Sequence, residues 1–109
     1  TQACWGLTRS TTGYQITFAA EDDLRGIWRY TFDTWGPEQA DRYLDQIKDC
    51  CDAIGTGRLR PRSSERLPDG VSVHRCQHHY IFWIVIDIPV VIAVLHEKMD
   101  AVQRLADRL

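Results

Sequence analysis

The sequence lacks several features that would assign a function class at once. No apolar run approaches the roughly 20 residues that a membrane-spanning helix needs, and residues 1–13 lack the apolar stretch of a secretory signal. Positive charge is not in excess either, because 13 basic residues face 15 acidic ones and the formal net charge is -2. We therefore expect a cytoplasmic protein with no membrane partner, and one that does not hold nucleic acid by overall charge.

Signatures of catalysis are also missing. The chain has no nucleophile elbow, no glycine-rich phosphate loop and no HExxH helix. Its 109 residues suffice for one compact domain and leave no room for a separate cofactor fold. We expect no cofactor and no self-sufficient active site.

The cysteines lack the spacing of a disulfide framework or a zinc knuckle. They are Cys4, Cys50, Cys51 and Cys76. This pattern indicates reduced, partly buried thiols in an intracellular chain. His74, Cys76 and His78 alternate and would share one face of an extended strand, where they could chelate a metal. Because no downstream pair completes a ligand set, we expect no metal site.

What the sequence does contain is an apolar periodicity that predicts two helices. One inward stripe begins after residue 20 and comprises Leu24, Ile27, Trp28, Thr31 and Trp35. A second stripe comprises Ala40, Tyr43, Leu44, Ile47, Cys51 and Ile54. Gly36 and Pro37 suit the end of one helix and the start of the next, so the two helices are predicted to form a tight α-hairpin.

Strand patterns flank the predicted hairpin. Residues 14–18 alternate apolar and polar side chains, and residues 71–73 begin another strand. Residues 80–88 form a nearly unbroken apolar run, which predicts a central strand covered on both faces. Pro89 is expected to break this run before a last strand at residues 90–95.

The ends of the chain complete the predicted fold. Residues 1–13, rich in Thr, Ser and Gly, are expected to form a flexible extension of a domain that spans residues 14–109. A short amphipathic C-terminal helix is predicted from Met99, Val102, Leu105, Ala106 and Leu109. The expected fold class is α+β in the order β-α-α-β-β-β-α, with the hairpin packed on a small antiparallel sheet.

Charge is divided along this order. Residues 21–54 hold nine acidic and four basic side chains, whereas residues 55–86 hold five arginines and two acidic residues. Arginine binds anions through two parallel hydrogen bonds, so Arg58, Arg60 and Arg62 are candidate contacts for an acidic partner or RNA. The alternative is a solvated loop. Arg75 is a further candidate, with a cross-strand ion pair as the alternative.

Two histidines and two aromatic residues are the remaining candidates. His79 opens the long apolar strand and His96 closes the last one, so either could act as an acid or base. The alternative is that each bonds to a neighbouring backbone group. Tyr30 and Phe32 flank the inward stripe of the first helix and could edge a groove for a partner.

Three segments together resemble the ParE toxins of the ParE/RelE superfamily, over about residues 14–109. The first is the hairpin pattern from Ala20 to Tyr43. The second is the block Arg75-x3-His79-x-Ile81-Phe82-Trp83, and the third is the close from Val94 to Asp100 with Arg104-Leu105. Gln77 departs from the resemblance, because the family pattern usually has glycine there.

The resemblance implies a RelE/ParE-like β-α-α-β-β-β core and a toxin of a type II toxin–antitoxin system that stabilises a plasmid or chromosome. It implies a hetero-oligomer with a ParD-type antitoxin, DNA gyrase as the target, and operator DNA bound only through the antitoxin. Growth arrest would follow from binding, with no catalytic residue. The expected contacts with antitoxin or target are Arg58, Arg60, Arg62, Arg75, His79, Tyr30, Phe32, His96 and Met99.

The alternative within the same fold is a RelE-like, ribosome-dependent mRNA endonuclease. That chemistry needs cations at the scissile phosphate and a group that activates the ribose 2′-hydroxyl. Its candidates here would be His96 with Arg60, Arg62 and Arg75, but no tyrosine follows His96 where the RelE pattern has one.

Overall fold

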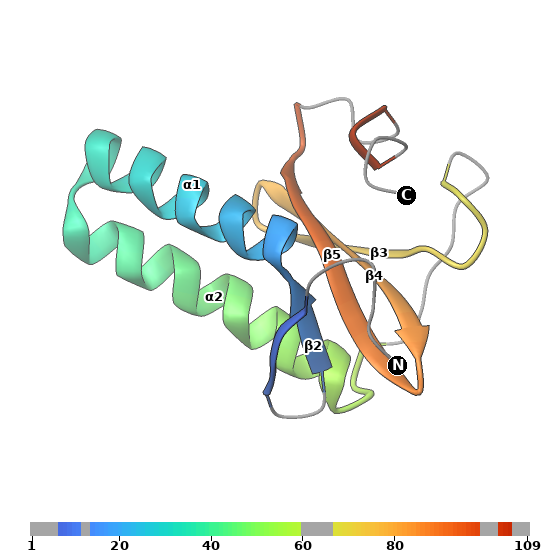
Figure 1. Cartoon of the computed structure of the whole chain (residues 1–109). Helices are drawn as coiled ribbons and strands as arrows, with labels where there is room; N and C mark the ends of the chain where they lie inside the picture. Colours follow the sequence, from blue (N-terminus) through green and yellow to red (C-terminus); the bar gives the residue numbers. More distant parts are fainter. Residues whose placement is uncertain (1–6, 12–13, 60–66, 99–102, 106–109) are drawn as a thin grey trace.

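The described chain forms an α-hairpin on one face of a mixed β-sheet. The computed structural model describes residues 7–11, 14–59, 67–98 and 103–105. Within them the elements are β1 (Leu7–Thr11), β2 (Tyr14–Thr17), α1 (Phe18–Trp35), α2 (Pro37–Gly55), β3 (Ser72–Cys76), β4 (His79–Ile86) and β5 (Ile88–His96). Figure 1 shows the two helices side by side against the strands. The predicted α+β class is confirmed, and from β2 to β5 so is the predicted order β-α-α-β-β-β.

The sheet differs from the expected antiparallel one in a single pairing. Its order among the described strands is β1-β2-β5-β4-β3, and β2 runs parallel to β5, with Gln15 opposite Val90 and Ile16 opposite Val91. The other neighbouring strands are antiparallel. A parallel pair needs a long crossover, which the hairpin and the two intervening strands provide. The middle strand of the five is therefore β5. Residues 79–86 form β4, which lies between β5 and β3 and is an interior strand, as predicted for residues 80–88.

The N-terminal part of the sheet shows two further differences from the prediction. Leu7–Thr11 pairs with β2 as β1, a strand that the sequence analysis did not predict. Phe18, expected in the first strand, begins α1 and is exposed. The helix starts there because Thr17 caps it, its hydroxyl accepting a hydrogen bond from the Ala20 backbone N–H at 3.1 Å.

The turn between β4 and β5 lies at Asp87, not at Pro89 as predicted. Asp87 has φ 63°, a left-handed conformation that aspartate tolerates. Pro89 lies inside β5, opposite Val85. The last part of β4 is also less covered than expected, since Val85 and Ile86 are both exposed.

Two apolar cores lie on opposite faces of the sheet. The hairpin covers one face, where Ile47 of α2 and Ile81 and Trp83 of β4 are buried. The second helix buries the predicted stripe, with Tyr43 half-buried at its edge. In α1, however, Trp35 is 71% exposed, so its assignment to the inward stripe was wrong. Trp28 of the same predicted stripe is also exposed, at 36%. Figure 1 shows the turn end of the hairpin lying beyond the strands, so the sheet does not cover the last part of α1.

The second core covers the other face of the sheet. Phe82, Ile92 and Leu95 pack there with Val71 and with Leu105, which is fully buried. Residues 103–105 are helical. Leu105 therefore packs on the chain's own sheet, whereas Met99, Val102, Ala106 and Leu109 lie outside the described residues.

The conformation of the turn from β3 to β4 explains why the family pattern usually has glycine where this chain has Gln77. Gln77 has φ 57°, a left-handed conformation that costs a residue with a Cβ about 1 kcal/mol or more. Glycine adopts it without that cost. Gln77 is exposed and keeps the conformation while its carbonyl accepts a hydrogen bond from Arg75 Nε at 3.0 Å.

We expect Gln77→Gly to raise the free energy of unfolding by about 0.5–1 kcal/mol, the relief of strain less the added freedom of the unfolded chain. Urea denaturation measures the change. Asp87→Gly is the matched control, with a smaller gain because aspartate already tolerates the left-handed region. A loss of stability in Gln77→Gly would contradict the prediction.

Candidate functional site

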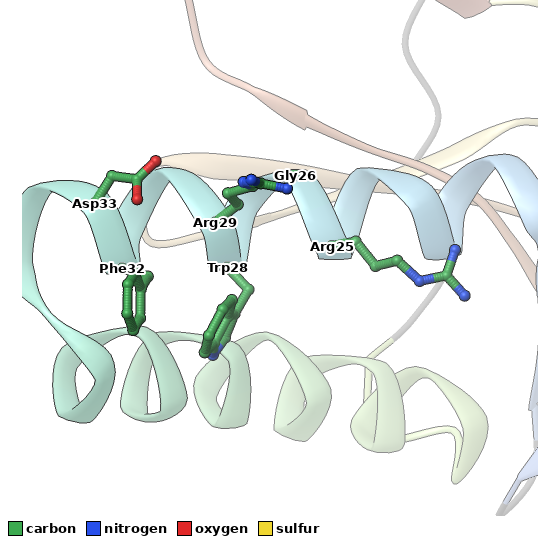
Figure 2. A pocket seen from close by; sticks show the side chains of 6 residues that line it. All are labelled: Arg25, Gly26, Trp28, Arg29, Phe32 and Asp33. Carbon is green, nitrogen blue, oxygen red and sulfur yellow. The ribbon is translucent and has the colours of Figure 1, made fainter.

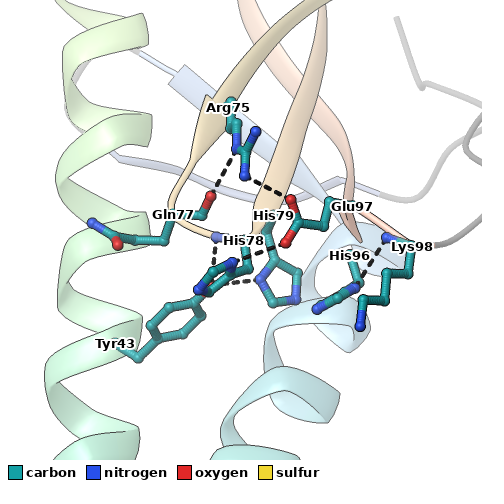
Figure 3. Close-up of polar contacts among 8 residues, drawn as sticks. All are labelled: Tyr43, Arg75, Gln77, His78, His79, His96, Glu97 and Lys98. Carbon is teal, nitrogen blue, oxygen red and sulfur yellow. Dashed lines mark hydrogen bonds and ion pairs between the residues drawn. The ribbon is translucent and has the colours of Figure 1, made fainter.

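A group of hydrogen-bonded polar side chains lies where the ends of β3, β4 and β5 approach α2. We call it the strand-end cluster and define it as Tyr43, Arg75, His78, His79, His96 and Glu97. The β4–β5 register brings His79 opposite His96. Tyr43 reaches the cluster from the half-buried edge of α2, as Figure 3 shows.

His79 and His96 form the inner part of the cluster. Their ring centroids lie 5.0 Å apart and the rings are perpendicular. The Tyr43 hydroxyl lies 2.7 Å from His79 Nδ1 and accepts a hydrogen bond from the His78 backbone N–H at 3.2 Å. A phenol has one proton to give. Its oxygen also has lone pairs that can accept a second hydrogen bond, so the donor between Tyr43 and His79 Nδ1 depends on the His79 tautomer.

The environment keeps His79 neutral. Burial, followed by the nearby His96 and His78, lowers the pKa of His79 to about 4. Burial likewise raises the pKa of Tyr43 above its ordinary value. At neutral pH both groups are therefore uncharged and joined by one hydrogen bond.

His96 is engaged by the backbone. Its Nδ1 accepts a hydrogen bond from the Lys98 N–H at 3.1 Å, which places the ring proton on Nε2. A neutral imidazole has a single acceptor nitrogen. In neutral His96 that nitrogen is already bonded to the backbone, so His96 presents no free base.

Glu97 binds the outer, cationic side of the cluster (Figure 3). One carboxylate oxygen lies 2.6 Å from Arg75 and the other 2.8 Å from His78 Nδ1. The hydrogen bond from His78, followed by the charge of Arg75, lowers the pKa of Glu97. The structure thus shows Arg75 in an ion pair, which was the alternative to its role as a partner contact.

A second candidate surface lies on α1 (Figure 2). Trp28 and Phe32 point toward α2 and stack with ring centroids 5.0 Å apart. Trp28 Nε1 donates to Asp41 of α2 at 3.0 Å. An open cavity of about 680 Å³ is lined by Arg25, Gly26, Trp28, Arg29, Phe32 and Asp33.

Large apolar side chains on this helix remain open to solvent. Tyr30 is 70% exposed, Trp35 is 71% exposed and Phe32 is 40% exposed. We call Trp28, Phe32 and Trp35, which share one side of the helix, the α1 aromatic surface; Tyr30, two positions from Trp28 and from Phe32, lies on the opposite side. Exposed aromatic clusters of this kind mark protein interfaces.

The other predicted site residues lie apart from both places. Arg58 is exposed beyond α2, with its Nε bonded to Thr56. Arg60, Arg62 and Met99 lie outside the described residues. Within the described part of the chain, no three His, Cys, Asp or Glu side chains are placed to hold a metal ion, and no helix there is long and apolar enough to cross a membrane.

The sequence analysis missed three members of the cluster. Tyr43 was assigned to the core, His78 was considered only as a metal ligand, and Glu97 was given no role. Part of a signal was available: folding the last two strands about a turn at Asp87 places residue 79 opposite residue 95, and the register shift between Phe82 and Trp83 moves it to residue 96. Assigning the break to Pro89 concealed it.

Comparisons with known proteins agree with this geometry. The model of the ParE toxin of the type II toxin–antitoxin system parDE matches residues 14–101. The chain is 39% identical over 100 residues to Toxin ParE of Escherichia coli, covering 90% of this chain and 97% of that protein. It is 30% identical over 92 residues to Toxin ParE1 of Mycobacterium tuberculosis strain H37Rv, covering 80% and 91%.

A solved structure supports the fold. The chromosomal ParDE toxin–antitoxin system from P. aeruginosa contains a chain that superposes with a TM-score of 0.68 at 18% identity, covering 78% of this chain and 95% of that one. The sequence matches carry the assignment further than fold: this chain belongs to the ParE toxin family of type II toxin–antitoxin systems.

Proposed function

We propose that the chain acts in the cytoplasm as a toxin that inhibits DNA gyrase and blocks replication, and that a ParD-type antitoxin neutralises it by direct binding. Family membership supports the toxin role. Operator DNA would be contacted through the antitoxin.

The observation that carries the proposal is the bonding of the strand-end cluster. The acceptor nitrogen of neutral His96 is occupied by the Lys98 backbone N–H, and Arg75 is held by Glu97. Cleavage of RNA would need a free base and free cations at the phosphate. Because His96 and Arg75 are already bonded within the fold, the cluster supports action by binding rather than by catalysis.

Purified chain, added to gyrase and supercoiled plasmid, tests the target. We expect linear DNA to accumulate once the enzyme is denatured, and an excess of the antitoxin encoded by the adjacent reading frame to prevent it. Ribosome-bound mRNA should stay intact. Codon-dependent cuts that His96→Ala abolishes would instead establish the nuclease.

We assign two surfaces of the chain to the antitoxin. Acidic side chains of the antitoxin would meet Arg58, Arg60 and Arg62, because arginine pairs bidentately with carboxylate. At Arg75 they would have to share the guanidinium with Glu97. Apolar side chains of the antitoxin would cover the α1 aromatic surface.

We expect Tyr30→Ala to weaken antitoxin binding by about tenfold or more, because exposed tyrosines are common anchors of interfaces. The fold should keep its stability to within about 0.5 kcal/mol, since the side chain is 70% exposed. Calorimetric titration measures the affinity.

The control for Tyr30→Ala is Thr34→Ala, at another exposed position of α1. It should leave the affinity unchanged. Equal affinities for the two variants would remove Tyr30 from the antitoxin interface.

A further inference from the structure

Two cysteines that are distant in sequence meet between the hairpin and the sheet. Cys50 lies on α2 and Cys76 ends β3, 26 positions later. Their sulfur atoms are 2.7 Å apart, and the Cys50 thiol donates to Cys76. The two sulfur atoms of a disulfide are about 2.0 Å apart. The reduced pair therefore needs only a small further approach to form a covalent bond.

Cys51, the third described cysteine, is less accessible for disulfide formation. Cys51 is 1% exposed within the core. Burial raises the pKa of its thiol to about 12, as it does for Cys76, so it is the contact with Cys50 that distinguishes Cys76. Cys50, by contrast, is only half-buried. Solvent-borne reagents can therefore reach Cys50 first, with Cys76 directly behind it.

We propose that Cys50 and Cys76 are a redox modification site that closes to an intramolecular disulfide on reaction with a small-molecule disulfide such as oxidised glutathione. The Cys50 thiolate attacks one sulfur of the reagent, forming a mixed disulfide and releasing one glutathione thiol. Cys76 then attacks the Cys50 sulfur and releases the second. Two protein thiols are oxidised and one glutathione disulfide is reduced to two thiols.

The bond would join α2 to β3 and thereby fix the hairpin against the edge of the sheet. It would close a loop of about 26 residues, which includes the arginine-rich segment from residue 58 to residue 66. Loop closure restricts the unfolded chain. For a domain of this size we expect Tm to rise by roughly 10–15 °C on oxidation.

Peptide mapping of the folded full-length chain tests the proposal. After treatment with oxidised glutathione, trypsin digestion without reductant should yield residues 49–58 linked to residues 76–98. The linked pair should weigh about 2 Da less than the two reduced peptides, because two hydrogens are lost. It should exceed every other linkage at least tenfold, whereas chain oxidised in urea should show mixed pairings.

Variants assign the bond within the first peptide, because Cys50 and Cys51 lie in the same one. Cys51→Ala should keep the linkage, and Cys50→Ser should lose it. Fragmentation of the wild-type linked peptide between residues 50 and 51 gives the same assignment without a variant. A bond to Cys51 or Cys4, a persistent glutathione adduct at Cys50, or a lower Tm after oxidation would each overturn the proposal.

Discussion

Replacing Trp83 by alanine is expected to lower the free energy of unfolding by about 3–5 kcal/mol, the usual cost of removing a large buried aromatic side chain. Trp83 is 1% exposed and contributes to the core beneath the hairpin. A domain of this size has a total stability of roughly 5–15 kcal/mol. The variant should therefore be partly unfolded at 37 °C and inactive as a toxin.

Trp35→Ala is the matched control, because it removes the same side chain from a site that is 71% exposed. Its stability should change by about 0.5 kcal/mol or less. Far-ultraviolet circular dichroism in urea is the measurement, since tryptophan fluorescence changes in both variants. Similar losses in the two variants would mean that Trp35 is packed in the fold.

Acidification is expected to destabilise the protein between pH 6.5 and pH 4 through His79. Its pKa is about 4 in the fold and near 6.5 when unfolded. In this window the unfolded chain binds more protons than the folded one, so stability is full above pH 6.5 and falls as the pH drops toward 4. Because His79 is partly exposed, we expect a loss of about 1–2 kcal/mol.

The groups around His79 allow its contribution to be separated. His96, His78, Glu97 and Asp23 all influence its titration. Glu97 titrates below its ordinary value, so its loss of charge comes at lower pH. His79→Asn keeps an acceptor for Tyr43 but cannot bind the proton, and the slope of stability against pH in this window should shrink. An unchanged slope in the variant would assign the effect to another group.

The helices could be predicted from the sequence because their signals are local. Apolar spacing, a glycine cap and a proline at the first helical turn each depend on a few neighbouring residues. Four of the five described strands were found for the same reason, and β1 was missed. Their arrangement was not found, since the parallel pairing of β2 with β5 joins residues about 75 positions apart.

The strand-end cluster was only half predictable for the same physical reason. His79 and His96 were candidates because each lies at a strand end, but their contact depends on the position of a turn. Asp87 could take the left-handed conformation, and Pro89 fitted near the start of a strand. Tyr43 combines a ring at the core edge with a hydroxyl that bonds outside it, which periodicity alone does not distinguish.

The place of β5 in the sheet sets the order in which the protein can fold during synthesis. Among the described strands it is the last in sequence and the middle one in space, hydrogen-bonded to β2 on one side and β4 on the other. Until residues 88–96 have left the ribosome, the two halves of the sheet have nothing to join them. We therefore expect the nascent toxin to stay unfolded through most of its translation and to complete its core in one late, cooperative step.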